Sequence, residues 1–368
     1  METILNYLTT IVDKRQSGKV RHNMGDIIAI VFFALLANVD DWVSIELFAQ
    51  DYEDFLKQYI ELPNGIPSHD TIERVFAMVA PEFLQNFRSH WDEMLNTNDG
   101  KKIQKLLAID GKVQRGNGNK NQRANHIVSA VDQNGFCVGE RLVDAKSNEI
   151  TAIPKLLDEL NIKGHIVTID SMGTQTEIAR KIRKKRADYV LALKGNQISL
   201  HEDVKLYFDD PALLKKCSYC KTVEKARGGI ETREYWQTED IQWLSQKKDW
   251  LGLKSIAMTR NTTVKGGKES SETRFFISSL PLEVVEIARA IRGHWIVESH
   301  HWHLDVTFRE DANQTADKQA AFNLNILRKL ALAVFKIYDI GRPNTSMRLK
   351  RKATGWHPIK HLTKILEL

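Results

Sequence analysis

The sequence predicts an α/β protein in which a mixed-sheet core carries a β-rich insertion domain and follows an N-terminal helical domain. Three observations predict this class. Helical patterns fill residues 1–95, strand and helix patterns alternate over residues 103–200, and strand patterns occupy residues 201–281, where the next core helix is expected. The 368 residues leave room for about two domains of roughly 150 residues each.

The N-terminal domain, residues 1–95, has apolar residues at helical spacing. One of its helices begins at Ser68-His-Asp-Thr71, where several side chains are suited to accept hydrogen bonds from the first turn. The apolar run Ile27–Val39 is shorter than the roughly 20 residues that span a bilayer, so we expect a buried helix. The predicted helices are Asp26–Asn38, Val43–Phe55 and Ser68–Val79.

The first part of the core, residues 103–200, predicts the order β-β-β-α-β-α-β. Asp132-Gln-Asn-Gly135 lies between two apolar runs and is typical of a hairpin turn. Helical patterns separate the later strands, which indicates a sheet with helices packed on it. The predicted strands are Leu106–Asp110, His126–Val131, Phe136–Val143, Ile166–Asp170 and Tyr189–Leu193, and the predicted helices are Ile150–Leu160 and Thr174–Lys185.

The core is expected to resume after the insertion. Residues 282–340 contain an acid-rich helix at 286–308 and an amphipathic helix at Asn323–Tyr338. The insertion itself, residues 201–281, shows β-type segments. Its predicted strands are Thr232–Gln237, Lys254–Arg260 and Thr273–Ser278.

The segment Arg292–Asp311 combines a helical pattern with acid and imidazole groups. His294, Glu298, His301 and Asp305 recur at i, i+4, i+7 and i+11, which places them on one face of a single helix. No lysine or arginine lies three or four residues from Glu298, so an ion pair within the helix is poorly supported. Carboxylates near apolar surroundings are normally paired or bind a metal.

Two aspartates are candidates to meet Glu298. Asp110 ends the apolar run that starts at Leu106, and Asp170 ends the run that starts at His165. Both runs read as buried strands, and the carboxyl ends of strands are where open α/β sheets bind ligands. Two aspartates and a glutamate make an all-oxygen site that suits Mg²⁺ or Mn²⁺. The alternative is that each aspartate only shapes a turn or caps a helix.

The charge balance favours a polyanionic partner. The 53 lysines and arginines exceed the 47 aspartates and glutamates by 6, and the sequence pI is about 9.0. One basic run is Lys181–Arg186, and another, Arg348–Lys352, lies in what we expect to be a basic C-terminal tail over residues 341–368. Each run either contacts the polyanion or forms a solvated face or helix end.

The cysteines exclude a disulfide framework. Cys217 and Cys220 form one CxxC, which is half of a zinc site without a matching second pair, and Cys137 lies in a predicted strand. This low cysteine count fits a reducing cytoplasm. The N-terminal segment lacks the layout of a signal peptide, so we expect no membrane association.

Histidines and tryptophans near Glu298 have two interpretations each. His294, His300, His301 and His303 suggest zinc by their number, but adjacent histidines spread around a helix, so we favour a polar surface. Trp295 and Trp302 lie on one side of the helix, and we favour core packing over stacking on an unpaired base.

The order of elements and acids resembles the ribonuclease-H-like core of DDE transposases. Several short sequence motifs are similar to those of one group of these transposases, the insertion-sequence transposases that include the H-repeat-associated proteins of Rhs elements. The motifs in the N-terminal segment resemble the helical domain that precedes the catalytic core in that group. These motifs are DKRQ at 13–16, NGIPSHDTIERVF at 64–76, AIDGK at 108–112, KSNEITAIP at 146–154, TIDSMGTQ at 168–175, ALKGNQ at 192–197 and HWIVESHHWHLDVTFRED at 294–311.

By this resemblance, the family's catalytic and metal-binding triad falls on Asp110, Asp170 and Glu298. The broader family places a tyrosine, an arginine and a lysine around its glutamate, in the pattern Tyr-x2-Arg-x3-Glu-x6-Lys. Ile291, His294 and Asp305 stand at those positions here. His294 is a candidate for part of the phosphate-contacting role and Arg292 lies nearby, whereas Asp305 cannot bind a phosphate as lysine would, so that contact comes from elsewhere or is lost.

The resemblance implies a metal-dependent DNA transposase that cuts at the ends of its own element and transfers the 3′ ends to target DNA by two-metal-ion phosphoryl transfer. It implies Mg²⁺, with Mn²⁺ able to substitute, and no organic cofactor. The expected partners are double-stranded DNA and a second copy of the chain, as a homodimer in the synaptic complex, with no membrane. The expected location is the cytoplasm, with the nucleoid when the protein is bound to DNA.

Two alternatives remain open from the sequence. One is a structure-selective DNA nuclease or resolvase on the same core, and the other is a catalytically inactive, domesticated DNA-binding protein. Further DNA-binding candidates are Lys194, Asn196 and Gln197 at the end of the fifth strand, where the alternative is an ordinary turn. Arg227 and Arg233 are candidates on the insertion.

Overall fold

The computed structural model describes residues 2–8, 10–95, 105–118, 120, 122–144, 147–226 and 228–367. The chain forms two compact units. The sheet unit comprises Lys101–Gly111 and Val128–Glu298, and the helical unit comprises Met1–Gly100, Lys112–Ile127 and Ser299–Leu368.

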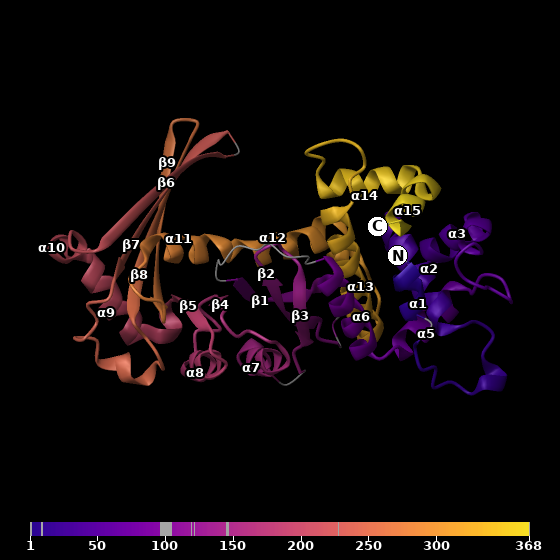
Figure 1. The fold of residues 1–368 in the computed structure, drawn as a ribbon, viewed down its shortest axis with the longest axis horizontal. Coiled ribbons are helices and arrows are strands. Elements are labelled where there is room, and N and C mark those ends of the chain that lie inside the picture. Colours follow the sequence, from indigo (N-terminus) through magenta and orange to yellow (C-terminus); the bar gives the residue numbers. More distant parts are fainter. Residues whose placement is uncertain are drawn as a thin grey trace. The chain divides into compact units, whose positions relative to one another are not determined.

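The sheet unit is built on a nine-stranded sheet with the strand order β3-β2-β1-β4-β5-β9-β8-β7-β6 (Figure 1). β1, β4 and β5 pair in parallel, and β9, β8, β7 and β6 continue outward from β5 in antiparallel pairs. The strands are β1 Leu106–Gln114, β2 Asn125–Asp132, β3 Cys137–Leu142, β4 Ile166–Ile169, β5 Asp188–Leu193, β6 Ser218–Ala226, β7 Gly229–Thr238, β8 Ser255–Lys265 and β9 Lys268–Ser278.

The predicted order β-β-β-α-β-α-β is confirmed element by element. The strands expected in the insertion belong to the same sheet as the core, because β9 pairs with β5. The sequence patterns missed β6 and the preceding helices, α9 Ile198–Asp209 and α10 Pro211–Leu214. Lys221–Lys225 of β6 are all exposed, so this part of the strand has no buried face to produce an alternating apolar pattern, whereas Cys220 near its start packs against the core.

Helices cover both faces of the sheet (Figure 1). α7 Glu149–Glu159 and α8 Thr176–Lys184 pack on the face to which Leu107 and Ile109 of β1 point. α11 Val284–Gly293 packs on the opposite face, together with Leu106. Side chains that alternate along a strand point to opposite faces, so burial on both sides explains the continuous apolar run of β1.

Gly293 allows α11 to approach the sheet closely. A Cβ atom at this position would lie 2.1 Å from Cδ2 of Leu106, which is itself buried in the core. α12 Trp295–Trp302 follows directly, so this contact also determines where the next helix begins. A larger residue at position 293 would force either the Leu106 side chain or the helix to shift.

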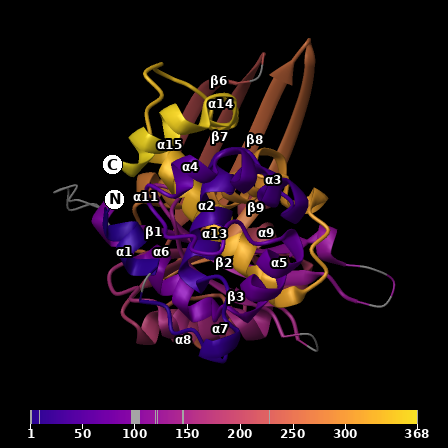
Figure 2. The ribbon, with the colours of Figure 1, turned by 90° about the vertical axis from the view of Figure 1, so that its right-hand side faces the viewer.

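The helical unit is organised around α13 Lys318–Ile337, in which every residue from Ala320 to Phe335 is buried. α13 contacts α2, α5, α6 and α14, and it lies amid the N-terminal helices in Figure 2. The predicted single apolar face was therefore wrong, because the helix is surrounded. Its polar side chains find partners, as when Asn323 Nδ2 donates to the carbonyl oxygens of Phe76 and Val79 at 2.8 and 2.9 Å.

The predicted N-terminal helices are confirmed, except that Val43–Phe55 forms two helices. The backbone at Tyr52, with φ −116° and ψ 25°, interrupts the helical path. Two more helices, α1 and α6, were not predicted. The helices of this segment are α1 Glu2–Leu8, α2 Met24–Leu36, α3 Trp42–Asp51, α4 Glu53–Leu56, α5 His69–Met78 and α6 Pro81–Leu95.

The segment expected to be a basic tail contains two helices, α14 Met347–Trp356 and α15 Pro358–Leu366. Arg351 is fully buried, with Nη2 2.5 Å from Oδ1 of Asp40 and its guanidinium 4.3 Å from the ring centre of Phe308. Arg351 is thus not available to an external polyanion, whereas Arg348 and Lys352 are exposed. All 13 residues of α2 are buried, and no helix among the described residues is long and apolar enough to cross a membrane.

Candidate active site

The two strand-end aspartates lie side by side. β1 and β4 are parallel neighbours in which Ile109 pairs with Ile169, so the next residues, Asp110 and Asp170, leave the paired region together. β1 continues beyond Asp110, whereas the chain turns after Asp170 into the loop that leads to α8. This register confirms that the two aspartates lie together, but the predicted end of the first strand at Asp110 was wrong, because β1 continues to Gln114.

A third carboxylate, which the sequence analysis missed, joins them. Glu149 is the first residue of α7 and is 9% exposed. Oxygen atoms of Asp110, Glu149 and Asp170 all lie within 4.8 Å of one another. The only sequence signal was an acid at the start of a predicted helix, which is equally typical of an ordinary helix N-terminus.

Glu298 faces this group from α12. Burial raises the pKa of Glu298, although its side chain reaches solvent, and the charges of Asp110 and Asp170 raise it further. Arg274 acts in the opposite direction. Glu298 is therefore close enough for the charges of both aspartates to affect its pKa, but it is not part of the group whose oxygens lie within 4.8 Å of one another.

Asp170 experiences the same crowding of negative charge. Burial raises its pKa first, and the neighbouring charges of Asp110 and Glu149 add to this effect. The backbone N–H of Gly173, which donates to Oδ1 of Asp170 at 3.2 Å, opposes it. An all-oxygen group with unfavourable mutual repulsion fits a hard divalent cation, because the cation relieves the repulsion.

The predicted stripe of one long helix was wrong. α11 ends at Gly293, α12 ends at Trp302, and a π-helical turn follows at His303–Thr307. Glu298 lies in the sheet unit, whereas Asp305 lies in the helical unit, where its Oδ1 is 2.7 Å from Nζ of Lys112. Asp305 is therefore half of a structural ion pair.

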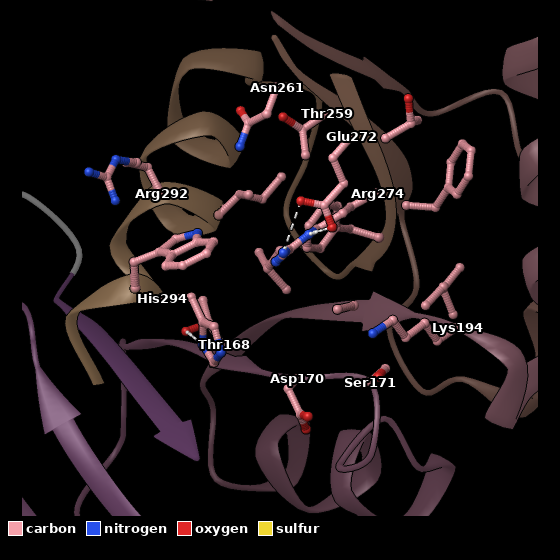
Figure 3. A pocket seen from close by; sticks show the side chains of 18 of the residues that line it. Thr168, Asp170, Ser171, Lys194, Thr259, Asn261, Glu272, Arg274, Arg292 and His294 are labelled. Carbon is pink, nitrogen blue, oxygen red and sulfur yellow. Dashed lines mark hydrogen bonds and ion pairs between the residues drawn. The ribbon is translucent and has the colours of Figure 1, made fainter. Parts of the chain in front are cut away.

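His294 remains at the site. Its Nδ1 and Oγ1 of Thr168 are 3.1 Å apart, and the dashed line in Figure 3 marks this contact. Thr168 is on β4, two residues before Asp170. The hydrogen bond therefore ties the start of α12 to the strand that carries Asp170.

A cavity of about 340 Å³ adjoins the carboxylates. Asp170 and Glu298 line it together with basic side chains from β7, β9, α11 and the residue after β5. Figure 3 labels Asp170 and three of the basic residues, Lys194, Arg274 and Arg292. Arg274 of β9 pairs with Glu272, with Nε 2.9 Å from Oε1, and its guanidinium lies 5.3 Å from the ring centre of Trp295. The basic residues that line the cavity are Lys194, Arg233, Arg274 and Arg292.

The other predicted DNA-binding residues have different surroundings. The side-chain amides of Asn196 and Gln197 donate to the carbonyl oxygens of Ser171 and Thr174, so they hold the loop that follows Asp170. Arg233 is 7% exposed and pairs with Glu224 and Glu231 on the outer strands. A phosphate would have to displace a carboxylate to reach it. Arg227 lies outside the described residues.

The expectations for nearby aromatic and imidazole groups were wrong in part. Trp295 and Trp302 are 37% and 52% exposed, so neither is in the core. His300 and His301 are 3% and 8% exposed, so neither is on the surface. Within the described ranges, no third metal ligand accompanies Cys217 and Cys220, and burial raises the pKa of Cys217 to about 11.

Comparison with known proteins places this geometry in context. A family model described as "Transposase DDE domain" matches residues 101–334, and a model described as "DDE_Tnp_1-associated" matches residues 5–92. "Putative transposase YncI" of Escherichia coli O157:H7 is 37% identical over 346 residues, which cover 91% of this chain and 88% of that protein.

Two further relatives extend the comparison. "H repeat-associated putative transposase YhhI" of Escherichia coli strain K12 is 35% identical over 359 residues, with 93% of each chain covered. "Uncharacterized protein in dhlA 3'region" of Xanthobacter autotrophicus is 40% identical over 268 residues, with 72% of this chain and 90% of that protein covered.

Proposed function

The chain belongs to the DDE transposase family, and from this premise we propose that it cuts DNA at the ends of its own element and joins the freed 3′ ends to a target. The meeting of Asp110 within β1 and Asp170 at the end of the parallel strand β4, with Glu298 close enough to feel both charges, carries this proposal. The three residues are the catalytic, metal-holding acids in this reading. They come from three elements that the sheet brings together.

The oxygen ligands suit Mg²⁺, with Mn²⁺ as a substitute, and no organic cofactor is needed. When bound, two such ions activate the attacking water or 3′-hydroxyl and stabilise the leaving oxygen. The carboxylates of Asp110 and Asp170 keep their positions because Asp110 lies in β1 and Asp170 directly follows β4, and these two strands are hydrogen-bonded neighbours inside the sheet. The Thr168–His294 hydrogen bond joins β4 to the start of the helix that carries Glu298.

The cavity beside the acids is suited to a nucleic acid backbone. Lys194 and Arg292 are exposed cations on its rim, and Arg274 reaches into it from β9 (Figure 3). Such groups position phosphates and make binding depend on salt concentration. Asn196 and Gln197 support the loop after Asp170, so they act on DNA indirectly. His294 takes the position of the family's arginine.

The same premise assigns a role to each part of the chain. Residues 1–95 read the element ends, residues 103–200 and 282–340 provide the ribonuclease-H-like catalytic core, and residues 201–281 are the insertion. A homodimer brings two element ends together. The match of a transposase-associated model to residues 5–92 supports a separate role for the N-terminal segment.

The test is strand cleavage by the purified protein on DNA that spans the flanks of its own gene. Wild type, Glu298→Gln and the control Glu177→Gln are compared in Mg²⁺, Mn²⁺ or EDTA. Glu177 is an exposed residue of α8 that pairs with Arg180, so the control removes a carboxylate away from the site.

Discrete cuts that require metal and disappear only in Glu298→Gln support the proposal. Cuts at branched junctions without joining of 3′ ends would indicate a structure-selective nuclease or resolvase. Salt-sensitive DNA binding without cleavage, equal in all three proteins, would indicate an inactive DNA-binding protein.

A further inference from the structure

We propose that Glu149 is a fourth acidic residue of the catalytic site, and that with Asp110 and Asp170 it holds one divalent cation while Glu298 serves the other. This inference rests on the proposed function. It adds to the triad a residue from α7, an element that does not contribute to the site in the sequence analysis.

The spacing of the oxygen atoms supports a shared ion. Oxygens of Asp110, Glu149 and Asp170 lie within 4.8 Å of one another. Divalent cations bind oxygen at about 2.0–2.6 Å, so two ligands on opposite sides of one ion are separated by about 4–5 Å. All three carboxylates can therefore reach a single ion with only small side-chain adjustments.

The placement of Glu149 also supports this role. Glu149 is 9% exposed and its carboxylate lies close to those of both aspartates, although α7 has solvent on its outer side, where Glu159 is exposed. Three carboxylates this close repel one another, and a divalent cation bound among them relieves that repulsion. Glu298 is outside the 4.8 Å group, and in this proposal it would serve the second ion.

A purely structural role for Glu149 makes a different prediction. A carboxylate in the first turn of a helix is stabilised by the helix dipole, and the side chain of Asn148 makes no capping hydrogen bond to this helix. If capping were the whole role, loss of the charge would lower thermal stability and leave metal affinity unchanged. If Glu149 binds the ion, metal affinity falls, and removal of its repulsion offsets part of the lost capping.

The experiment measures Mn²⁺ binding to the full chain by calorimetry and by the electron paramagnetic resonance of free Mn²⁺. Wild type is compared with Glu149→Gln, Glu149→Asp and the control Glu159→Gln, which lies at the other end of α7 and pairs with Arg141. We expect one Mn²⁺ to bind at least tenfold more weakly to Glu149→Gln, while Glu159→Gln matches wild type.

Glu149→Asp covers the case in which Glu149→Gln does not fold. It keeps the charge at the start of the helix but withdraws the carboxylate by one methylene. A several-fold weaker Mn²⁺ affinity with an unchanged melting temperature supports the inference, and wild-type affinity in either folded variant overturns it.

The same proteins separate this inference from the proposed function. If wild type cleaves DNA with Mn²⁺ and Glu149→Gln binds Mn²⁺ normally, the fourth residue is refuted and the transposase activity stands. If wild type does not cleave its flanking DNA but Glu149→Gln loses Mn²⁺ affinity, the metal site stands and the proposed activity fails.

Discussion

Lys112→Met should strongly destabilise the helical unit. Nζ of Lys112 lies 2.7 Å from Oδ1 of Asp305 and 2.7 Å from Oε2 of Glu310, and the Lys112 and Glu310 side chains are 7% and 1% exposed. At an effective dielectric constant of about 20, each contact is worth about 6 kcal/mol of attraction. Desolvation of the ions offsets much of this, and removal of one partner of a buried pair costs about 3–5 kcal/mol in practice.

The assay is urea unfolding followed by circular dichroism, with Lys57→Met as the control. Lys57 pairs with Glu53 on the surface of the same unit, so its loss should leave the unfolding midpoint unchanged. The cost of combining Lys112→Met with Glu310→Leu should be smaller than the sum of the two single costs, because both changes remove the same ion pair, although Glu310→Leu also removes a partner of the buried Arg328. A midpoint for Lys112→Met equal to that of Lys57→Met would refute this reasoning.

Three other predictions concern pH and DNA. Burial acts to raise the pKa of Glu310, but Lys112 and Arg328 overcome it and lower the pKa to about 2. The stability that this group contributes is therefore complete above about pH 4.5 and is lost as the pH falls toward 2. Urea midpoints are measured between pH 2 and pH 7 for wild type and Lys112→Met, and a wild-type midpoint that falls no more with acid than that of Lys112→Met would contradict this. Burial and neighbouring charges raise the pKa values of Asp170 and Glu298, so apo stability from these groups falls as the pH rises through those values. The rise in melting temperature caused by Mn²⁺ should accordingly grow as the pH rises through the mildly acidic range, and an equal rise at every pH would argue against carboxylate ligands. Trp295→Ala should weaken the binding of single-stranded or end-frayed DNA by about 1–3 kcal/mol, because an exposed ring beside the cavity offers a stacking surface for bases. Fluorescence anisotropy measures this DNA affinity, and the Mn²⁺ affinity of the variant, which should not change, is the internal control. A DNA affinity equal to that of wild type would show that the ring only packs against Arg274.

The positions of Asp110 and Asp170 follow from local sequence. Each aspartate ends a short apolar run, and such runs form strands buried on both faces when helices cover them. β2, β3 and α7 lie between them in the chain, and α7 carries the chain from β3 across to β4, which pairs in parallel with β1 and so brings Asp170 beside Asp110. These are statements about backbone preference and burial, and both are encoded within a few residues of each aspartate.

The contributions of Glu149, Arg274 and Trp295 depend on packing between elements. Glu149 reads as an ordinary acid at a helix start until α7 is placed on the sheet beside β1 and β4. Trp295 has the spacing of a core residue, yet it is exposed because it lines a cavity instead of packing in the core. Burial is a property of what lies opposite a side chain, and a periodic pattern does not contain that information.

The sequence by itself determined the class of protein, the order of the core strands and helices and the existence of an acidic site on the sheet. Only the tertiary structure decided which charges pair and which stay together as a site. Asp305 looked like a companion of Glu298 on one helix, but Lys112, far away in the chain, takes it as an ion-pair partner after the helix changes to a π-helical turn. Helical spacing predicts which residues share a face only while the helix remains regular, whereas ion pairs between distant segments depend on how whole elements pack.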